Sequence, residues 1–222
     1  MDGDLRLRDG GARAQGVTRA IVFDLFETLV DYDEQKSLGF SAAAANLLGC
    51  DPEEFHTVWR AGRPARDSGP LRDYLASIGV IGGEADRLVE LRRASSLRLL
   101  AEPRAGVIDT IDELRQRGLG VGLITVCSED VADVWEETPF AGAFDAVVFS
   151  CSCGYRKPDP RIYELALREL GVEAAESIFV GDGTNDELTG AESVGMRAVQ
   201  IGATQPWSGE RISTIPEVLD LL

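Results

Sequence analysis

Short apolar runs alternate with amphipathic segments along much of the chain. Five runs have the length of buried strands and are bounded by polar or glycine-containing turns. They cover residues 20–23, 120–124, 144–149, 177–180 and 197–201. Helix-forming segments separate the later runs, and a last helix is expected over residues 215–222. This alternation predicts an α/β fold, a doubly wound parallel sheet with helices on both faces.

The stretch after the first apolar run has a different pattern. From about residue 35 to residue 102 it is rich in Ala, Leu, Glu and Arg, and it favours four helices with no strand between them. We therefore predict a small all-helical cap domain over residues 33–102, inserted into a core domain of residues 17–32 and 103–222. Residues 1–16 mix Asp, Arg and Gly without an apolar run, which predicts a disordered tail.

Composition and charge narrow the range of partners. The chain of 222 residues is 44% hydrophobic, enough for a packed core, and its formal net charge is −16. A nucleic acid backbone or an anionic membrane would be repelled, so we expect neither as a partner. No apolar run reaches the roughly 20 residues of a membrane span, and no signal peptide is recognisable, so a cytoplasmic protein is expected. The sequence leaves open whether it is a monomer or a homodimer.

Histidine and cysteine chemistry is not indicated. The single histidine, His56, lies in a helical segment, and the four cysteines lack the spacing of a zinc site. We expect free thiols in a reducing compartment. The candidate chemistry must therefore come from carboxylates, hydroxyls and amines.

Polar side chains follow three of the predicted strands. Asp24 follows the first strand, Thr125 the second, and Asp182 and Asp186 the fourth. The carboxyl ends of parallel strands meet at one edge of a sheet, where open α/β sheets bind ligands. Lys157 precedes a predicted helix and can reach the same edge. The pattern around Asp24 alone also fits an aspartate that caps a turn, so the site depends on all of these positions together.

This set of residues suits the transfer of an anionic group. Asp24 would attack in line, Thr125 would donate a hydrogen bond, and Lys157 with a Mg²⁺ ion would neutralise the oxygens of the group. Carboxylate oxygens, such as those of Asp182 and Asp186, are ligands that Mg²⁺ prefers. The expected partner is a small-molecule anionic substrate.

Four motifs carry a resemblance to a known family. They are 23–29 (FDLFETL), the strand that ends at Thr125, 156–160 (RKPDP) and 181–186 (GDGTND). In this order, with a helical insert after the first strand, the sequence resembles the haloacid dehalogenase (HAD) superfamily of hydrolases, subfamily I with a helical C1-type cap. The resemblance extends from Thr18 to the C-terminus, and it implies a Rossmann-like core with a cap that closes over the site.

The resemblance assigns roles to residues of this chain. It implies that Asp24 is the nucleophile and that Thr125 and Lys157 hold the transferring group. It implies Mg²⁺ ligands from Asp24, the carbonyl of Phe26, Asp182 and Asp186. We further expect substrate binding by residues beside these motifs, namely Phe26, Glu27, Thr28, Val126 and Arg156.

Two departures from the family pattern bear on the activity. Phe26 stands where the phosphatases of the family carry a second aspartate, which protonates the leaving group and then activates water. Val126 stands where many relatives carry asparagine. Glu27 replaces the commoner glycine and is a candidate substitute acid, although an adjacent position usually points elsewhere.

Three functions fit these residues. The favoured one is a magnesium-dependent phosphatase of a small phosphorylated metabolite with an activated leaving group. A 2-haloacid dehalogenase is the first alternative, because halide leaves without a proton, but Asp182 would then repel a carboxylate substrate. The second alternative is a non-catalytic phosphate-binding homologue.

The cap segment contains Arg60, Arg63 and Arg66. By default we interpret them as solvent-exposed side chains, and they are also the nearest cations that could hold a substrate anion.

Overall fold

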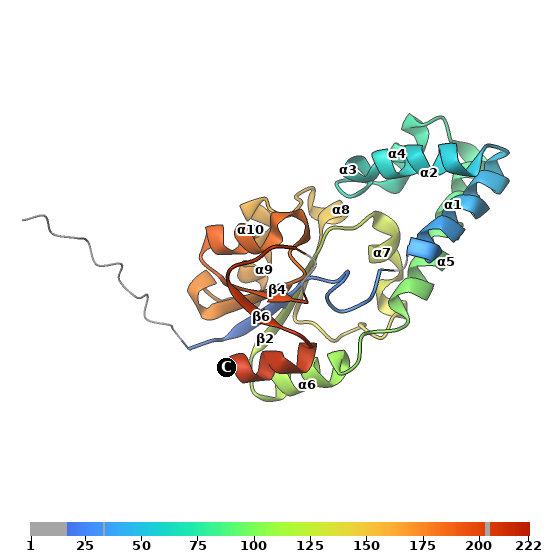
Figure 1. The fold of residues 1–222 in the computed structure, drawn as a ribbon. Coiled ribbons are helices and arrows are strands. Elements are labelled where there is room, and N and C mark those ends of the chain that lie inside the picture. The colour runs from blue at the N-terminus through green and yellow to red at the C-terminus, as the bar shows by residue number, and fades with distance from the viewer. Residues whose placement is uncertain (1–16, 33, 203–204) are drawn as a thin grey trace, which may run out of the picture.

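The computed structural model describes residues 17–32, 34–202 and 205–222, and it contains a six-stranded sheet beside a helical insert (Figure 1). The strands are β1 (Ala20–Phe23), β2 (Gly120–Thr125), β3 (Ala146–Phe149), β4 (Ser177–Gly181), β5 (Arg197–Ile201) and β6 (Glu210–Ile212). Their order across the sheet is β3-β2-β1-β4-β5-β6, and every neighbouring pair is parallel. The predicted fold class is confirmed.

Helices lie on both faces of the sheet and in the insert. The core contains α6 (Val107–Gln116), α7 (Glu129–Val134), α8 (Ser150–Cys153), α9 (Pro160–Leu170) and α10 (Glu187–Val194), with 3-10 helices η1 (Trp135–Glu137), η2 (Ala174–Glu176), η3 (Thr184–Asp186) and η4 (Ile215–Leu221). The insert contains α1 (Glu34–Leu48), α2 (Pro52–Ala61), α3 (Arg63–Arg66), α4 (Leu71–Ser77) and α5 (Gly82–Leu100).

Strand β1 lies at the centre of the sheet and is buried on both faces. Ile21 and Phe23 pack into the apolar cluster that includes α6 and α7. Val22 points the other way, into the cluster formed with α9 and α10. The alternation follows from the pleat of a strand, in which successive side chains point to opposite faces. Burial on both sides fixes the register of β1 and hence the position of the residue that follows it.

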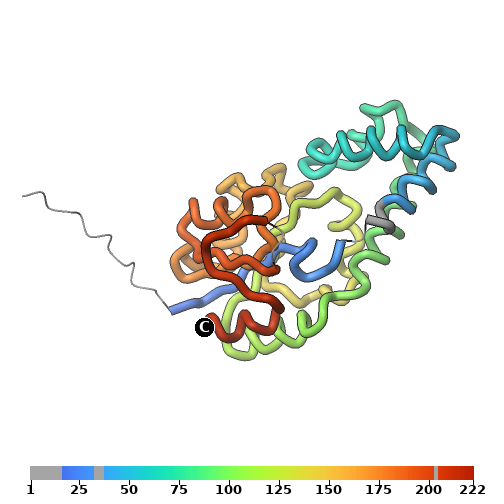
Figure 2. The backbone as a smooth tube through the Cα atoms, viewed as in Figure 1, coloured from blue at the N-terminus to red at the C-terminus, as the bar shows by residue number. Residues whose placement is uncertain are grey.

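The insert has an apolar cluster of its own. Trp59 is at its centre, with the ring centroids of Phe40 and Phe55 at 4.9 and 5.7 Å and that of Tyr74 at 5.6 Å. Five helices form instead of the expected four, because the segment after α2 adds the single turn of α3. Figure 2 shows the insert extending away from the sheet. Its status as a separate domain over residues 33–102 stays a prediction.

The two ends of the insert meet at Arg104. Its backbone N–H donates a hydrogen bond to the carbonyl of Leu29 at 2.8 Å. Its Nε lies 2.6 Å from a carboxylate oxygen of Asp31, and its Nη2 lies 3.2 Å from Glu27. One side chain thus ties the segment that enters the insert to the segment that leaves it.

The structure differs from the sequence prediction at the C-terminal part of the sheet. Strand β6 was not predicted, because only Ile212 of its three residues is buried and no apolar run marks it. The closing helix η4 is a 3-10 helix. The tail predicted over residues 1–16 lies outside the described residues. Among the helices that are described, none combines the length and the apolar character needed to cross a membrane.

Candidate active site

Asp24 directly follows the central strand and is 5% exposed. Its backbone N–H donates to the carbonyl of Val180 on β4 at 2.9 Å, which continues the pairing of the two strands beyond the end of β1. Thr125 ends β2 on the other side and is completely buried. The hydroxyl oxygen of Thr125 has no hydrogen-bond partner among the described residues. A buried hydroxyl without a partner among the described residues is suited to bind a ligand oxygen.

Lys157 brings a positive charge to the same place. It comes from the loop before α9, and its side chain is 1% exposed. Its Nζ forms an ion pair with Asp24, and it lies 2.5 Å from Glu187 Oε2 and 3.3 Å from the carbonyl oxygen of Ile124. Burial alone would lower the pKa of Lys157, but the two carboxylates outweigh it and raise the pKa to about 12. Lys157 is therefore positively charged at neutral pH.

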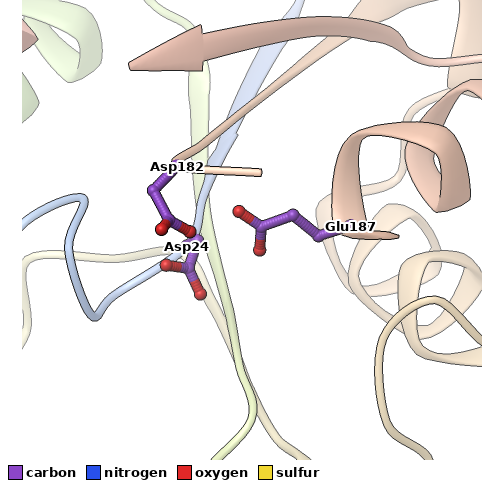
Figure 3. A group of neighbouring side chains, drawn as sticks. All are labelled: Asp24, Asp182 and Glu187. Atoms are coloured by element: carbon purple, nitrogen blue, oxygen red, sulfur yellow. The ribbon is translucent and has the colours of Figure 1, made fainter. Parts of the chain in front are cut away.

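Three buried carboxylates converge at the end of the sheet. Oxygen atoms of Asp24, Asp182 and Glu187 all lie within 4.8 Å of one another, and Figure 3 shows the three groups turned toward a common point. Burial raises the pKa of Asp24 despite Lys157. Burial and the charge of Asp24 raise the pKa of Glu187 to about 8. Both carboxyl groups thus hold a proton more readily than usual, a proton that a bound cation would displace, and the oxygen donors fit a hard divalent cation such as Mg²⁺.

Glu187, and not Asp186, completes this cluster. Asn185 and Asp186 both have left-handed backbone conformations, with φ of 55° and 54°, and the Asp186 side chain is exposed. Glu187 follows as the first residue of α10, and its Oε1 accepts a hydrogen bond from the backbone N–H of Gly183 at 2.9 Å. A Cβ at Gly181 would lie 2.2 Å from Glu187 Oε1, so the fit of Glu187 needs glycine there. The geometry does not support Asp186 as a ligand.

A cavity of about 580 Å³ lies between this edge of the sheet and the insert. Phe26, Glu27 and Val126, expected to bind substrate, line its core side. The insert contributes Trp59 and Arg66, among others, to its other wall. The cavity therefore opens beside the residues that flank Asp24 and Thr125 in the sequence.

Two expected substrate-binding residues do not line this cavity. Thr28 is completely buried, and its hydroxyl has no partner among the described residues. Arg156 lies 3.4 Å from a carboxylate oxygen of Asp67 in the insert, so it joins the core to the insert. For these two residues, the geometry does not support direct substrate contact.

Glu27 is engaged away from the carboxylate cluster. It has a left-handed backbone with φ of 60°. One carboxylate oxygen accepts a hydrogen bond from the backbone N–H of Tyr32 at 2.7 Å, and the other lies 3.2 Å from Arg104. Both oxygens are thus occupied in holding the start of the insert, which weakens Glu27 as a candidate for the missing acid.

Comparisons with known proteins agree with this geometry. A family model described as haloacid dehalogenase-like hydrolase matches residues 18–195. Glyceraldehyde 3-phosphate phosphatase of Methanothermobacter thermautotrophicus is 27% identical over 83% of this chain and 86% of its own. Pyrophosphatase PpaX of Bacillus velezensis is 30% identical over 77% of each chain. A 2-haloacid dehalogenase structure from Pseudomonas syringae pv. Tomato has a TM-score of 0.72 at 23% identity, covering 92% of this chain and 98% of that one, which shows a shared fold alone.

Proposed function

Because this chain belongs to the haloacid dehalogenase-like hydrolases, we propose that it is a magnesium-dependent phosphatase with Asp24 as its nucleophile. The observation that carries the proposal is the group of three buried carboxylates within 4.8 Å of one another. A carboxylate substrate would be repelled there, whereas a metal ion would turn the same residues into a site for phosphoryl oxygens. Phosphatase names among the relatives agree with this choice.

Each residue of the cluster has a defined task in this mechanism. Asp24 attacks phosphorus, the bond from phosphorus to the leaving oxygen breaks, and the leaving group departs as an anion. Lys157 and the Thr125 hydroxyl bind oxygens of the phosphoryl group. Water then attacks the phosphorus of the aspartyl phosphate, which releases phosphate and restores the Asp24 carboxylate.

The metal would be held by Asp24, Asp182 and Glu187, with the backbone carbonyl of Phe26 as a further expected ligand. When bound, Mg²⁺ neutralises negative charge on the transferring group. Lys157 keeps Asp24 and Glu187 in place through its two ion pairs.

Phe26 points to the class of substrate. It lines the cavity two residues after the nucleophile, and it has no proton to give. A positioned general acid is worth roughly a hundred- to ten-thousandfold in rate, so poor leaving groups such as sugar alkoxides would react slowly here. We therefore propose a small phosphorylated metabolite whose leaving group is stable as an anion, such as an aryl phosphate, an acyl phosphate or a phosphoanhydride.

Phe26 is also the residue that favours the dehalogenase alternative. Halide needs no proton, so Phe26 is no handicap to the displacement of halide by Asp24. A screen of phosphate esters and 2-haloacids, each with Mg²⁺ and with a chelator, separates the two activities. We expect hydrolysis of activated phosphates that the chelator abolishes. Chelator-insensitive release of halide would instead favour the dehalogenase, and Asp24→Asn serves as the inactive control for both.

A further inference from the structure

Arg66 is a buried cation that has no carboxylate partner among the residues that the structure describes. It lies on α3 at the wall of the cavity and is 6% exposed. Its guanidinium carbon lies 3.8 Å from the centroid of the Trp59 ring, and an Nη atom donates to the Trp59 carbonyl. Its Nε has no hydrogen-bond partner among the described residues. Burying an arginine in this way costs free energy unless an anion compensates it.

No carboxylate among the described residues forms an ion pair with Arg66. The adjacent Asp67 lies 3.2 Å from Arg63 and 3.4 Å from Arg156, so two other arginines already hold it. Burial lowers the pKa of Arg66 to about 10, and the nearby charge of Arg92 acts in the same direction, while Tyr74 and Asp67 offset only part of this. Arg66 remains cationic at neutral pH.

The surrounding wall adds further positive charge. Arg60, Arg63 and Arg92 line the same cavity, whose only acidic lining residues among those described are Glu27 and Asp67. Arg60 is exposed and has no carboxylate partner in the described part of the chain. Arg63 pairs with Asp67 and Arg92 with Asp130, so among the described residues Arg60 and Arg66 carry the unpaired positive charge of this wall, in a chain whose formal net charge is −16. A local reversal of this kind attracts an anion.

The cavity wall that carries Arg66 faces residues that are neighbours of the carboxylate cluster in the sequence, although the three carboxylates do not line the cavity themselves. The core side of the cavity is formed by Phe26, Val126 and Thr184, each within two residues of Asp24, Thr125 or Asp182. A volume of about 580 Å³ is in the range of sites for small metabolites. Resting on the proposed function, we infer that the leaving group of the substrate carries a second anion, a carboxylate or a phosphate, which Arg66 binds with the help of Arg60.

The test compares substrates that differ only in this second charge. The first pair is 4-carboxyphenyl phosphate and its neutral analogue 4-carbamoylphenyl phosphate, both with aryl leaving groups. The second pair is 1,4-phenylene bisphosphate and 4-hydroxyphenyl phosphate. A hydrogen-bonded charge pair is worth about 1.5–3 kcal/mol, so we expect kcat/KM to favour an anionic member by roughly ten- to hundredfold, mainly through KM. The pair with the larger preference identifies the anion.

Variants assign the preference to the arginines. Arg66→Gln should bring the ratio of kcat/KM within each substrate pair close to one, while Arg66→Lys should retain part of the preference. Arg72→Gln is the matched control, because it removes an exposed arginine of the insert that pairs with Asp86 at 2.7 Å and does not line the cavity. If Arg66→Gln does not fold, Arg60→Gln, which changes an exposed side chain, should reduce the ratio.

Each outcome bears on the inference. Equal kcat/KM within both substrate pairs would overturn it, as would a preference that survives in Arg66→Gln and Arg60→Gln. If no ester is hydrolysed, the proposed function fails, and calorimetry of the same compounds decides the inference separately. Tighter binding of the anionic members by the wild type than by Arg66→Gln would then support the second anion site, and equal binding would exclude it.

Discussion

Glu187 forms an ion pair with Lys157, in which Oε2 and Nζ lie 2.5 Å apart, and both side chains are almost completely buried. Its other carboxylate oxygen is held by the backbone N–H of Gly183 at 2.9 Å. Glu187, the first residue of α10, is thereby fixed against Lys157, which also forms an ion pair with Asp24. Glu187 therefore positions Lys157, and in the proposed function it would also offer an oxygen to the metal.

We expect Glu187→Gln to lower kcat/KM by at least roughly tenfold. Mutation of a residue that orients metal ligands commonly lowers metal affinity or activity by roughly ten- to hundredfold. Asp186→Asn, which changes the exposed neighbour, should leave activity near that of the wild type. Phosphatase assays over a range of Mg²⁺ concentrations measure both, and Glu187→Gln should need more Mg²⁺. A larger loss in Asp186→Asn than in Glu187→Gln would return the ligand role to Asp186.

Asp24→Asn should abolish turnover and keep the fold. Removing a catalytic nucleophile typically costs several orders of magnitude in kcat, roughly a millionfold in well-studied cases. The change is nearly isosteric, and Lys157 keeps its ion pair with Glu187. Steady-state kinetics tests the loss of turnover, and circular dichroism of the same preparation tests whether the fold is kept. Wild-type activity in a folded Asp24→Asn protein would rule out the covalent mechanism.

Phe26→Asp should broaden the range of leaving groups. The new carboxyl group would supply the proton that the wild type lacks. The rate of alkyl phosphate hydrolysis should therefore rise by roughly a hundredfold, and that of aryl phosphate hydrolysis by less. The measurement is the rate against the pKa of the leaving group for both proteins. A wild-type rate independent of that pKa would mean that another group already donates the proton.

Asp130 joins the core to the insert, and its loss should loosen this junction. It is fully buried, it lies 2.8 Å from Arg92 on α5, and it accepts hydrogen bonds from Ser96 and Ser128. We expect Asp130→Asn to lower the free energy of unfolding by about 3 kcal/mol, since Arg92 is left without its partner. Asp133→Asn, on the same helix but partly exposed beside Arg93, should cost only a few tenths of a kcal/mol. Denaturant unfolding at neutral pH compares the two.

The effect of Asp130 should also depend on pH. Burial would raise its pKa, but Arg92 and the two hydroxyl groups outweigh burial and lower the pKa below the ordinary value of 3.8. A carboxyl group with a lowered pKa in the folded state contributes stability that is complete above its unfolded pKa and is lost as pH falls through its folded pKa. The difference between the wild type and Asp130→Asn should therefore be constant above about pH 5 and shrink in stronger acid. A difference that grows as pH falls would contradict this assignment.

Much of the site could be predicted, because strand ends are visible in the sequence. A buried apolar run marks each central strand, and the first polar residue after it must lie at the edge of the sheet. This reasoning located Asp24, Thr125 and Asp182. Lys157 was found from its loop before a helix capped by Asp159 and closed by Gly171.

Glu187 was missed because local backbone geometry decides which carboxylate turns inward. Both Asn185 and Asp186 adopt left-handed conformations, and this kink points Asp186 to solvent and starts α10 at Glu187. Sequence spacing does not reveal such a kink. The glycine at 181, which leaves room for the Glu187 carboxylate, is a signal in the sequence that is consistent with this placement.

The contact of Arg104 with both ends of the insert has a consequence for how the sequence of this chain can evolve. Leu29 and Arg104 are a hydrogen bond apart, so for the sheet the whole insert is equivalent to a surface loop. The entropic cost of closing a loop rises only slowly with its length. The insert can therefore be lengthened, shortened or exchanged while β1 and β2 keep their register, which lets substrate choice diverge without rebuilding the catalytic residues.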